Sequence, residues 1–323
     1  MSTLKVVGAG SWGTALAIAL APRFERIELW ARDPALVSAM ARERENSRYL
    51  AGFALPANVH PTDALAGEAD FILNAVPSQH TRHVFSRLAI PDNARLVSAS
   101  KGIERGSLRR VSQVMTEVTG RPVAVLSGPS FAREVAAGEP AAMVVAAEER
   151  ALAALVQEAF STPLFRLYTS ADPMGVELGA ALKNVIAIAA GVVQGLGLGS
   201  NTRAALIARG LSEITRLAVA MGAEARTLSG LAGLGDLVLT CTGDLSRNRR
   251  VGIELARGQA LSDILKKLAM VAEGVDTTEA ALALAGRHGV EMPITAQVAV
   301  LLRGEQSPED AIRQLMVRSL KSE

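Results

Sequence analysis

The sequence predicts an α/β protein in which a domain with a mostly parallel β-sheet is followed by a domain made only of helices. Up to about residue 172, short apolar runs alternate with polar segments of helical character. Continuous apolar strands separated by helices are typical of a parallel sheet covered on both faces. From Asp172 onward the pattern is helical only. We therefore expect two domains, residues 1–172 and residues 173–323, which suits the length of the chain.

Eight strands are predicted in the first domain, most of them rich in Val, Leu and Ile. In chain order they are Leu4–Val7, Arg26–Arg32, Asn58–His60, Asp70–Val76, Arg95–Ser100, Val123–Ser127, Ala142–Ala146 and Phe165–Tyr168. A helix is expected over Pro34–Asn46, with Asp33 as its N-cap and Pro34 in its first position. A brief helical turn is expected over Asp63–Ala66.

Helical patterns fill the second domain. They cover Gly175–Gln194, Asn201–Met221, Ala225–Gly230, Asn248–Arg257, Leu261–Leu268, Thr277–His288, Pro293–Leu302 and Pro308–Leu315. The stretch from Val176 to Gly199 is apolar enough to suggest a membrane span, but Glu177, Lys183, Asn184 and Gln194 interrupt it. Charges at the centre of a bilayer are costly, so we expect a buried helix and no membrane span.

The first strand runs into a glycine-rich loop, Gly8-Ala9-Gly10-Ser11-Trp12-Gly13, and then into the alanine-rich segment Thr14–Ala21. A G-x-G-x-x-G loop between a strand and a helix is typical of a Rossmann-like dinucleotide site. Gly8 allows the turn, Gly10 admits a pyrophosphate and Gly13 lets the helix pack closely, while free N–H groups face the anion. The alternative is a turn that only packs a helix on a sheet.

The end of the second strand bears on the choice between NAD and NADP. An acidic residue there would bind the ribose 2′-hydroxyl of NAD, but the chain has Arg32, with Asp33 one place later. Arg32 can pair with a 2′-phosphate, which favours NADP. Alternatively, Arg32 is a solvated residue at a strand end, and Asp33 supports some binding of NAD.

Residues that follow the later strands are also candidates, because ligands of an open parallel sheet bind outside the carboxyl ends of its strands. Lys101 follows the strand that ends at Ser100, and Gly128-Pro129-Ser130 follows the strand that ends at Ser127. Lys101 is a candidate for binding cofactor phosphate and substrate, or else a solvated lysine. The segment at Gly128 reads as a helix start with a hydroxyl and free N–H groups.

Lys183 is the most unusual residue of the second domain, because the helix around it is otherwise apolar. A buried lysine resists being charged, so its pKa should fall toward the range that is useful for proton transfer. Asp236, in the glycine-rich run Gly230–Gly243, is a candidate partner. We favour a catalytic role over a structural salt bridge, since perturbed titratable groups cluster at functional sites.

Three arginines lie in Ser246-Arg247-Asn248-Arg249-Arg250, at the start of a predicted helix. Cations are unfavourable there because the helix dipole is positive at that end, unless an anion joins them. Ser246, Arg247, Asn248 and the free N–H groups would make a good phosphate site. The alternative is that the arginines face solvent or a partner subunit. Further on, Asp276 is expected to cap the helix that begins at Thr277.

Composition excludes several classes of protein. Lys and Arg number 34 and Asp and Glu 32, and aromatic residues make up only 3% of the chain, so a nucleic-acid partner is not expected. Cys241 is the single cysteine, and the four histidines show no shared ligand spacing, so no disulfide and no metal site are expected. The N-terminus runs directly into the first strand, which leaves no room for a cleavable signal, and we expect a cytoplasmic protein.

Taken together, the motifs GAGSWGTALA, NAVPSQ, SASKGIE, LSGPSFAREVA, ELGAALKNVIAIAAG, GLGDLVLTCTGDLSRNRRVG and VAEGVDT resemble the bacterial NAD(P)-dependent glycerol-3-phosphate dehydrogenases. The resemblance runs from Leu4 to about Thr278. It implies reversible hydride transfer between NADPH or NADH and dihydroxyacetone phosphate. The product would be sn-glycerol 3-phosphate, which supplies phospholipid synthesis. It also implies a cytoplasmic enzyme that forms a homodimer.

By motif, Lys183 matches the catalytic lysine of this family, which protonates the carbonyl oxygen as hydride arrives. The positions that match substrate contacts are Lys101, Gly128, Ser130, Lys183, Asp236, Ser246, Arg247 and Asn248. Those that match or would form the cofactor site are Gly8, Gly10, Ser11, Trp12, Gly13, Arg32, Lys101, Ala132, Arg247, Val271 and Glu273.

Two other classes of protein compete with this interpretation. A related β-hydroxyacid dehydrogenase would share the dinucleotide domain and a helical lysine, but it should lack an arginine cluster for phosphate. A non-catalytic NAD(P)-sensing protein would keep the glycine loop, but it would have no reason to bury Lys183.

Overall fold

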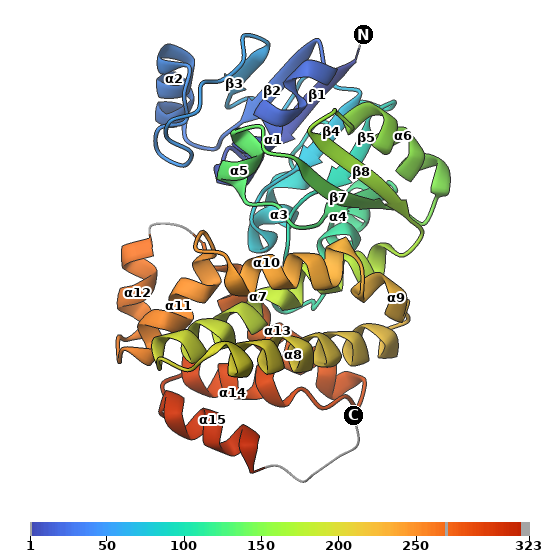
Figure 1. Ribbon diagram of the computed structural model, residues 1–323. Coiled ribbons are helices and arrows are strands. Elements are labelled where there is room, and N and C mark those ends of the chain that lie inside the picture. Colours follow the sequence, from blue (N-terminus) through green and yellow to red (C-terminus); the bar gives the residue numbers. More distant parts are fainter. Residues whose placement is uncertain (1, 269–270, 318–323) are drawn as a thin grey trace. The chain divides into compact units, whose positions relative to one another are not determined.

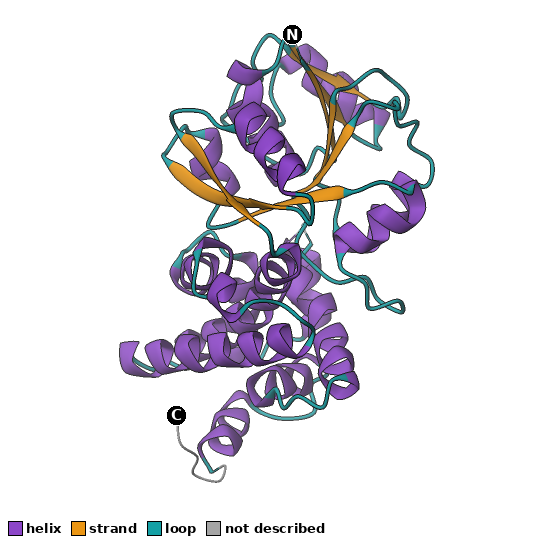
Figure 2. Cartoon of the chain, turned by 90° about the vertical axis from the view of Figure 1, so that its right-hand side faces the viewer, coloured by secondary structure: helices purple, strands orange, loops and turns teal. Residues whose placement is uncertain are grey.

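The structure is a computed structural model that describes residues 2–268 and 271–317. The chain forms two compact units. The first, here called the sheet unit, comprises Met1–Lys101 and Arg109–Glu177, and the second, the helical unit, comprises Gly102–Leu108 and Leu178–Glu323. All the strands belong to the sheet unit, while the helical unit consists of helices and loops (Figures 1 and 2).

The eight strands form one sheet in the order β3-β2-β1-β4-β5-β6-β7-β8. Their bounds are β1 Thr3–Val7, β2 Arg26–Trp30, β3 Val59–Thr62, β4 Phe71–Asn74, β5 Arg95–Ser98, β6 Val123–Ser127, β7 Ala141–Ala146 and β8 Phe165–Ser170. All neighbours pair in parallel except β6 and β7, which are antiparallel. The predicted α/β class with a mostly parallel sheet is confirmed. Chain order reverses between β1 and β4, which is where a ligand crevice forms in such sheets.

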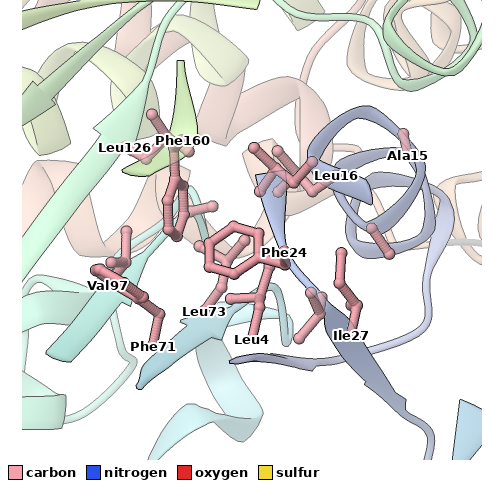
Figure 3. Packing of buried hydrophobic residues seen from close by; sticks show 14 of the residues in the cluster. Leu4, Ala15, Leu16, Phe24, Ile27, Phe71, Leu73, Val97, Leu126 and Phe160 are labelled. Atoms are coloured by element: carbon pink, nitrogen blue, oxygen red, sulfur yellow. The ribbon is translucent and has the colours of Figure 1, made fainter. Parts of the chain in front are cut away.

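Seven helices accompany the strands of the sheet unit. They are α1 Ser11–Leu20, η1 Ala21–Arg23, α2 Pro34–Glu43, α3 Ser78–Phe85, α4 Val111–Thr119, α5 Ala132–Ala136 and α6 Arg150–Phe160. Helices cover both faces of the sheet, and this explains why its central strands are apolar on both sides. On one face Phe24, Phe71 and Phe160 pack edge to face, with ring centroids 5.4–5.8 Å apart (Figure 3).

Two local predictions for this unit have different outcomes. The Asp33 cap of α2 is confirmed, since its carboxylate accepts the N–H of Ala35 at 3.0 Å. The helical turn over Asp63–Ala66 is wrong. The carbonyl of Asp63 accepts the indole N–H of Trp30 at 3.0 Å, and the carbonyl of Ala66 accepts the Lys5 ammonium at 2.7 Å. Side chains from β1 and β2 thus hold this segment in a non-helical course.

The helical unit is built around the long helix α7. The elements are α7 Pro173–Gly195, which begins in the sheet unit, then α8 Ser200–Ala220, α9 Ala225–Leu228, the π-helix η2 Leu231–Gly235, α10 Asp236–Thr242, α11 Arg247–Ala256, α12 Leu261–Leu268, α13 Glu273–Arg287, α14 Pro293–Leu302 and α15 Pro308–Met316. By length and composition α7 could cross a membrane, but its most apolar 18-residue window is entirely buried in the protein. The interpretation as a core helix therefore fits the structure.

Two differences from the predicted helices affect the site. The run Gly230–Gly243 forms η2 and α10, which glycine content alone does not predict. Helix α13 begins at Glu273, with Ala272 as N-cap, so Asp276 lies inside the first turn and the prediction that it caps the helix is wrong. Its carboxylate instead pairs with Arg105, from the short segment of the helical unit that follows Lys101.

Candidate functional site

The glycine loop between β1 and α1 has the shape that a dinucleotide needs. A Cβ on Gly8, whose φ is +117°, would lie 2.8 Å from the backbone of Ala75, and one on Gly13 would collide with the carbonyl of Gly8. A Cβ on Gly10 would meet nothing within 4 Å. Backbone packing therefore requires glycine at two positions, whereas the third glycine faces open space, where a pyrophosphate could approach the N–H groups at the start of α1.

The loop is held in place by the segment that follows α2. Buried Asn46 donates from Nδ2 to the carbonyl of Ala9 at 2.9 Å and to the Thr14 hydroxyl at 2.8 Å. The Ser11 hydroxyl donates to the carbonyl of Tyr49 at 2.7 Å. Trp12 donates its indole N–H to the carbonyl of Ala99 at 3.1 Å, which ties α1 to the end of β5. The residues present thus fit a bound dinucleotide, with a preorganised phosphate loop.

Just after β2, the side chain of Arg32 is exposed to solvent, whereas the carboxylate of Asp33 already accepts hydrogen bonds. Arg32 is exposed and makes no hydrogen bond or ion pair with any residue in the described part of the chain. Asp33 accepts from Ala35 through one oxygen and from Arg48 through the other, at 3.0 and 3.1 Å. An exposed ion pair of this kind contributes at most about 1 kcal/mol to folding.

Lys101, Gly128 and Ser130, predicted from separate strand ends, come together in the sheet unit. The Lys101 ammonium lies 3.2 Å from the carbonyl of Gly128 and 3.5 Å from the Ser130 hydroxyl, which itself donates to that carbonyl at 2.9 Å. Gly128 has a φ of +153°, and a Cβ there would lie 2.9 Å from Met143 on β7. Ala132 begins α5, a five-residue helix that packs beside α1.

Lys183 lies on α7 and is only 5% exposed, and its ammonium forms an ion pair with the fully buried carboxylate of Asp236 at the start of α10. It also donates to the hydroxyl of Thr240 at 2.8 Å, one turn further along α10. The predicted partner is therefore the actual one. A buried charge that is paired and hydrogen-bonded can be retained in the interior.

The arginines at the start of α11 have different environments. Arg249 is buried and donates to Gln194 at 2.8 Å, to the carbonyl of Gly243 at 2.7 Å and to Asp244 at 3.0 Å, so it serves the fold. Ser246 caps the helix by accepting the N–H of Arg249 at 3.2 Å. The side chain of Arg247, by contrast, is exposed to solvent. Surrounding protein nevertheless removes enough water to lower the pKa of its guanidinium, against the opposing charge of Glu273.

Asn248 joins α11 to α7 and α13. Its Nδ2 donates to Oδ1 of Asn184 at 2.9 Å, and its Oδ1 accepts the N–H of Gly274 at 3.0 Å. A Cβ on Gly274 would lie 2.7 Å from the carbonyl of Asn184, so glycine is needed for this close approach. Next to it, Glu273 lies in the first turn of α13, and Val271 is exposed just before the helix.

Two polar residues of this group were not predicted as site residues. One is Asn184, which follows Lys183 directly. The other is Thr240, four residues after Asp236, so a helix predicted over α10 would have placed Asp236 and Thr240 on one face. Helix α10 was not predicted because glycines, which disfavour helices, lie directly before and after it. Among residues 2–268 and 271–317, no cluster of three His, Cys, Asp or Glu side chains could hold a metal ion.

The predicted site residues thus fall into two groups, each within one unit. The sheet unit holds the glycine loop, Arg32, Ala132 and the three residues Lys101, Gly128 and Ser130. The helical unit holds the Lys183–Asp236 pair, the start of α11, and Val271 with Glu273.

Comparison with known proteins bears on what these groups do. A family model described as "NAD-dependent glycerol-3-phosphate dehydrogenase N-terminus" matches residues 3–153, and one described as the C-terminus of the same enzyme matches residues 172–313. The chain is 53% identical, over 99% of its length and 98% of the relative, to the glycerol-3-phosphate dehydrogenase [NAD(P)+] of Citrifermentans bemidjiense. It is 50% identical to that of Koribacter versatilis, over 100% of the chain and 99% of the relative. Among solved structures, the glycerol-3-phosphate dehydrogenase of Coxiella burnetii superposes with a TM-score of 0.94 at 40% identity, covering 98% of this chain and 99% of that one.

Proposed function

The chain belongs to the NAD-dependent glycerol-3-phosphate dehydrogenase family, and from this premise we propose that it reduces dihydroxyacetone phosphate to sn-glycerol 3-phosphate with NADPH or NADH, reversibly. The observation that carries the proposal is the buried Lys183 ammonium, paired with Asp236 on an otherwise apolar helix. A protein that only bound the dinucleotide would have no use for this pair.

The glycine loop binds the cofactor. Gly10 leaves room for a pyrophosphate, which the N–H groups of Ser11, Trp12 and Gly13 at the start of α1 would hold. When bound, the nicotinamide supplies or accepts the hydride. Arg32 favours the 2′-phosphate of NADP by charge. Lys101, Ala132, Arg247, Val271 and Glu273 complete the proposed cofactor contacts.

Lys183 acts as the general acid in the proposed reaction. Its ammonium donates a proton to the carbonyl oxygen of the substrate as hydride reaches the carbon, and in the reverse direction its amine accepts the hydroxyl proton. Asp236 pairs with the ammonium in its buried setting, and Thr240 fixes the direction of the side chain through its hydrogen bond at 2.8 Å.

The substrate phosphate is proposed to bind at the start of α11. Arg247 and Asn248 supply the donors, while Ser246 caps the helix whose positive end faces the anion. Asn248 donates one N–H to Asn184, and within residues 2–268 and 271–317 its second N–H has no acceptor, so it is available for a ligand. Lys101, Gly128 and Ser130 form the proposed substrate contacts of the sheet unit, where their polar atoms already lie within 3.5 Å of one another.

The remaining parts of the proposal follow from the same family. Residues 1–172 serve as the dinucleotide-binding domain and residues 173–323 as the substrate and catalytic domain. The enzyme works in the cytoplasm as a homodimer, and its product supplies phospholipid synthesis. Sedimentation of the purified protein tests the dimer directly.

The test is the loss of NADPH absorbance when dihydroxyacetone phosphate is added, with a non-phosphorylated 2-keto acid as control. We expect oxidation of NADPH only with the phosphorylated substrate. Oxidation with the 2-keto acid alone would identify a β-hydroxyacid dehydrogenase. NADPH binding without oxidation by either substrate would identify a sensing protein.

A further inference from the structure

The segment that follows α2 is hydrogen-bonded to the glycine motif and contains a second arginine, Arg48. Segment 46–50 is joined to the motif by the Asn46 hydrogen bonds to Ala9 and Thr14, at 2.9 and 2.8 Å, and by the bond from Ser11 to the carbonyl of Tyr49 at 2.7 Å. Asn46 is fully buried, so the segment has little freedom to move away. Arg48 lies between these two anchors.

The position of Arg48 is set by the end of β2. Its Nη1 lies 3.1 Å from Oδ2 of Asp33, and its guanidinium lies over the ring of Tyr49, 5.2 Å from the centroid. Asp33 is the residue next to Arg32, whose side chain is exposed. Arg32 is thus next to Asp33 in the sequence, whereas Arg48, 15 residues further on, is brought to Asp33 only by the fold.

Asp33 is the acid that would bind the ribose 2′-hydroxyl of NAD, but both of its oxygens are engaged. Oδ1 accepts the N–H of Ala35 at the start of α2, and Oδ2 accepts from Arg48. The carboxylate is thus turned toward its own helix and neutralised by a neighbour. Arg48 thus places one guanidinium beside Asp33, whose charge it balances, and Arg32, the preceding residue in the chain, supplies a second arginine that is exposed.

We propose that Arg48 is a specificity-determining residue that, with Arg32, binds the 2′-phosphate of NADP, and that Asp33 holds Arg48 in place and does not bind the ribose of NAD. This inference rests on the proposed function only in assuming that the sheet unit binds a nicotinamide dinucleotide. Guanidinium groups pair with phosphate through parallel hydrogen bonds, which gives the second arginine both charge and direction.

The test is titration of the whole protein with NADPH and with NADH, followed by fluorescence and without any substrate. For Arg48→Ala we expect the Kd for NADPH to rise by about tenfold or more, because a charge-assisted bond is worth roughly 1.5–3 kcal/mol, while the Kd for NADH hardly changes. Arg42→Ala is the matched control, because Arg42 is an exposed arginine on α2 that pairs with neighbouring Glu43. It should change neither constant.

Asp33→Asn separates the two roles of the acid, since asparagine is also a good N-cap. We expect NADH binding to be retained. Weaker NADH binding in this variant would show that Asp33 binds the ribose, and equal loss or no loss of both cofactors in Arg48→Ala would overturn the role of Arg48.

These outcomes are independent of the reaction. If dihydroxyacetone phosphate is not reduced but Arg48→Ala selectively weakens NADPH binding, the proposed function fails and this inference stands. If the substrate is reduced and Arg48→Ala affects both cofactors alike, the reverse holds.

Discussion

Replacing Lys183 by alanine tests both its chemistry and its place in the fold. The substitution leaves the carboxylate of Asp236 fully buried without its cation. Breaking a buried pair in this way typically costs roughly 3–5 kcal/mol. For a unit of this size the corresponding fall in Tm is roughly 6–20 °C. Since general acid catalysis is worth about 10²–10⁴-fold, kcat should fall by at least two orders of magnitude.

The assay combines turnover of NADPH with dihydroxyacetone phosphate, NADPH binding by fluorescence, and thermal unfolding. Turnover should disappear while NADPH still binds, because the cofactor loop lies in the sheet unit. The double variant Lys183→Ala with Asp236→Asn removes the buried charge, so it should regain part of the lost Tm and none of the turnover. Lys266→Ala, at an exposed lysine of α12, is the control and should resemble the parent protein. A Lys183→Ala enzyme with full turnover would refute the catalytic role.

Three further predictions concern other parts of the two units. Arg247→Ala should raise the KM for dihydroxyacetone phosphate by tens-fold, because a charge-assisted bond is worth roughly 1.5–3 kcal/mol; steady-state kinetics with an unchanged KM would argue against the phosphate role. Gly10→Ala should keep the Tm, because its Cβ meets no protein atom, but it should weaken NADPH binding, because the Cβ enters the space proposed for the pyrophosphate. Gly13→Ala should lower the Tm and weaken NADPH binding, because its Cβ collides with the carbonyl of Gly8. Similar effects in both variants would contradict this reasoning. Burial raises the pKa of Glu213, which accepts the N–H of Ile294 at 2.6 Å, above its usual 4.5. The folded chain then retains a proton that the unfolded chain releases, so the contribution of Glu213 to stability falls as the pH rises from 4.5 through the raised pKa. Urea unfolding across that range should show this slope in the parent protein, and Glu213→Gln should not have it.

Much of the fold could be predicted because its signals are local. Apolar runs gave all eight strands, and the Asp33-Pro34 pair marked the start of α2 where the structure has it. The predicted turn over Asp63–Ala66 failed because its carbonyls bind Trp30 and Lys5, which are distant in the sequence. Helix α10 was missed because its flanking glycines weaken the local signal, whereas packing at Gly233, where a Cβ would collide with Leu228, requires a glycine.

The candidate site shows the same division. The glycine loop and Lys183 were recognisable because each departs from its local pattern in a way that chemistry explains. Asn184 and Thr240 were not, since a buried asparagine or threonine looks like an ordinary helical residue until its partner is known. The cluster of arginines was recognised as a group, but the sequence could not divide it into Arg249, which serves the fold, and Arg247, which is exposed.

By itself, the sequence determined the α/β class, the dinucleotide loop, the lysine in an apolar helix and the family resemblance, because each rests on short motifs or apolar runs that can be recognised without knowing their neighbours in space. Tertiary structure decided which charges are already satisfied. Asp33 is engaged by Arg48, Arg249 by Asp244, and Lys183 by Asp236, 53 residues away. Electrostatic and hydrogen-bond partners depend on distance in space, and only the folded chain fixes which of them remain available for a ligand.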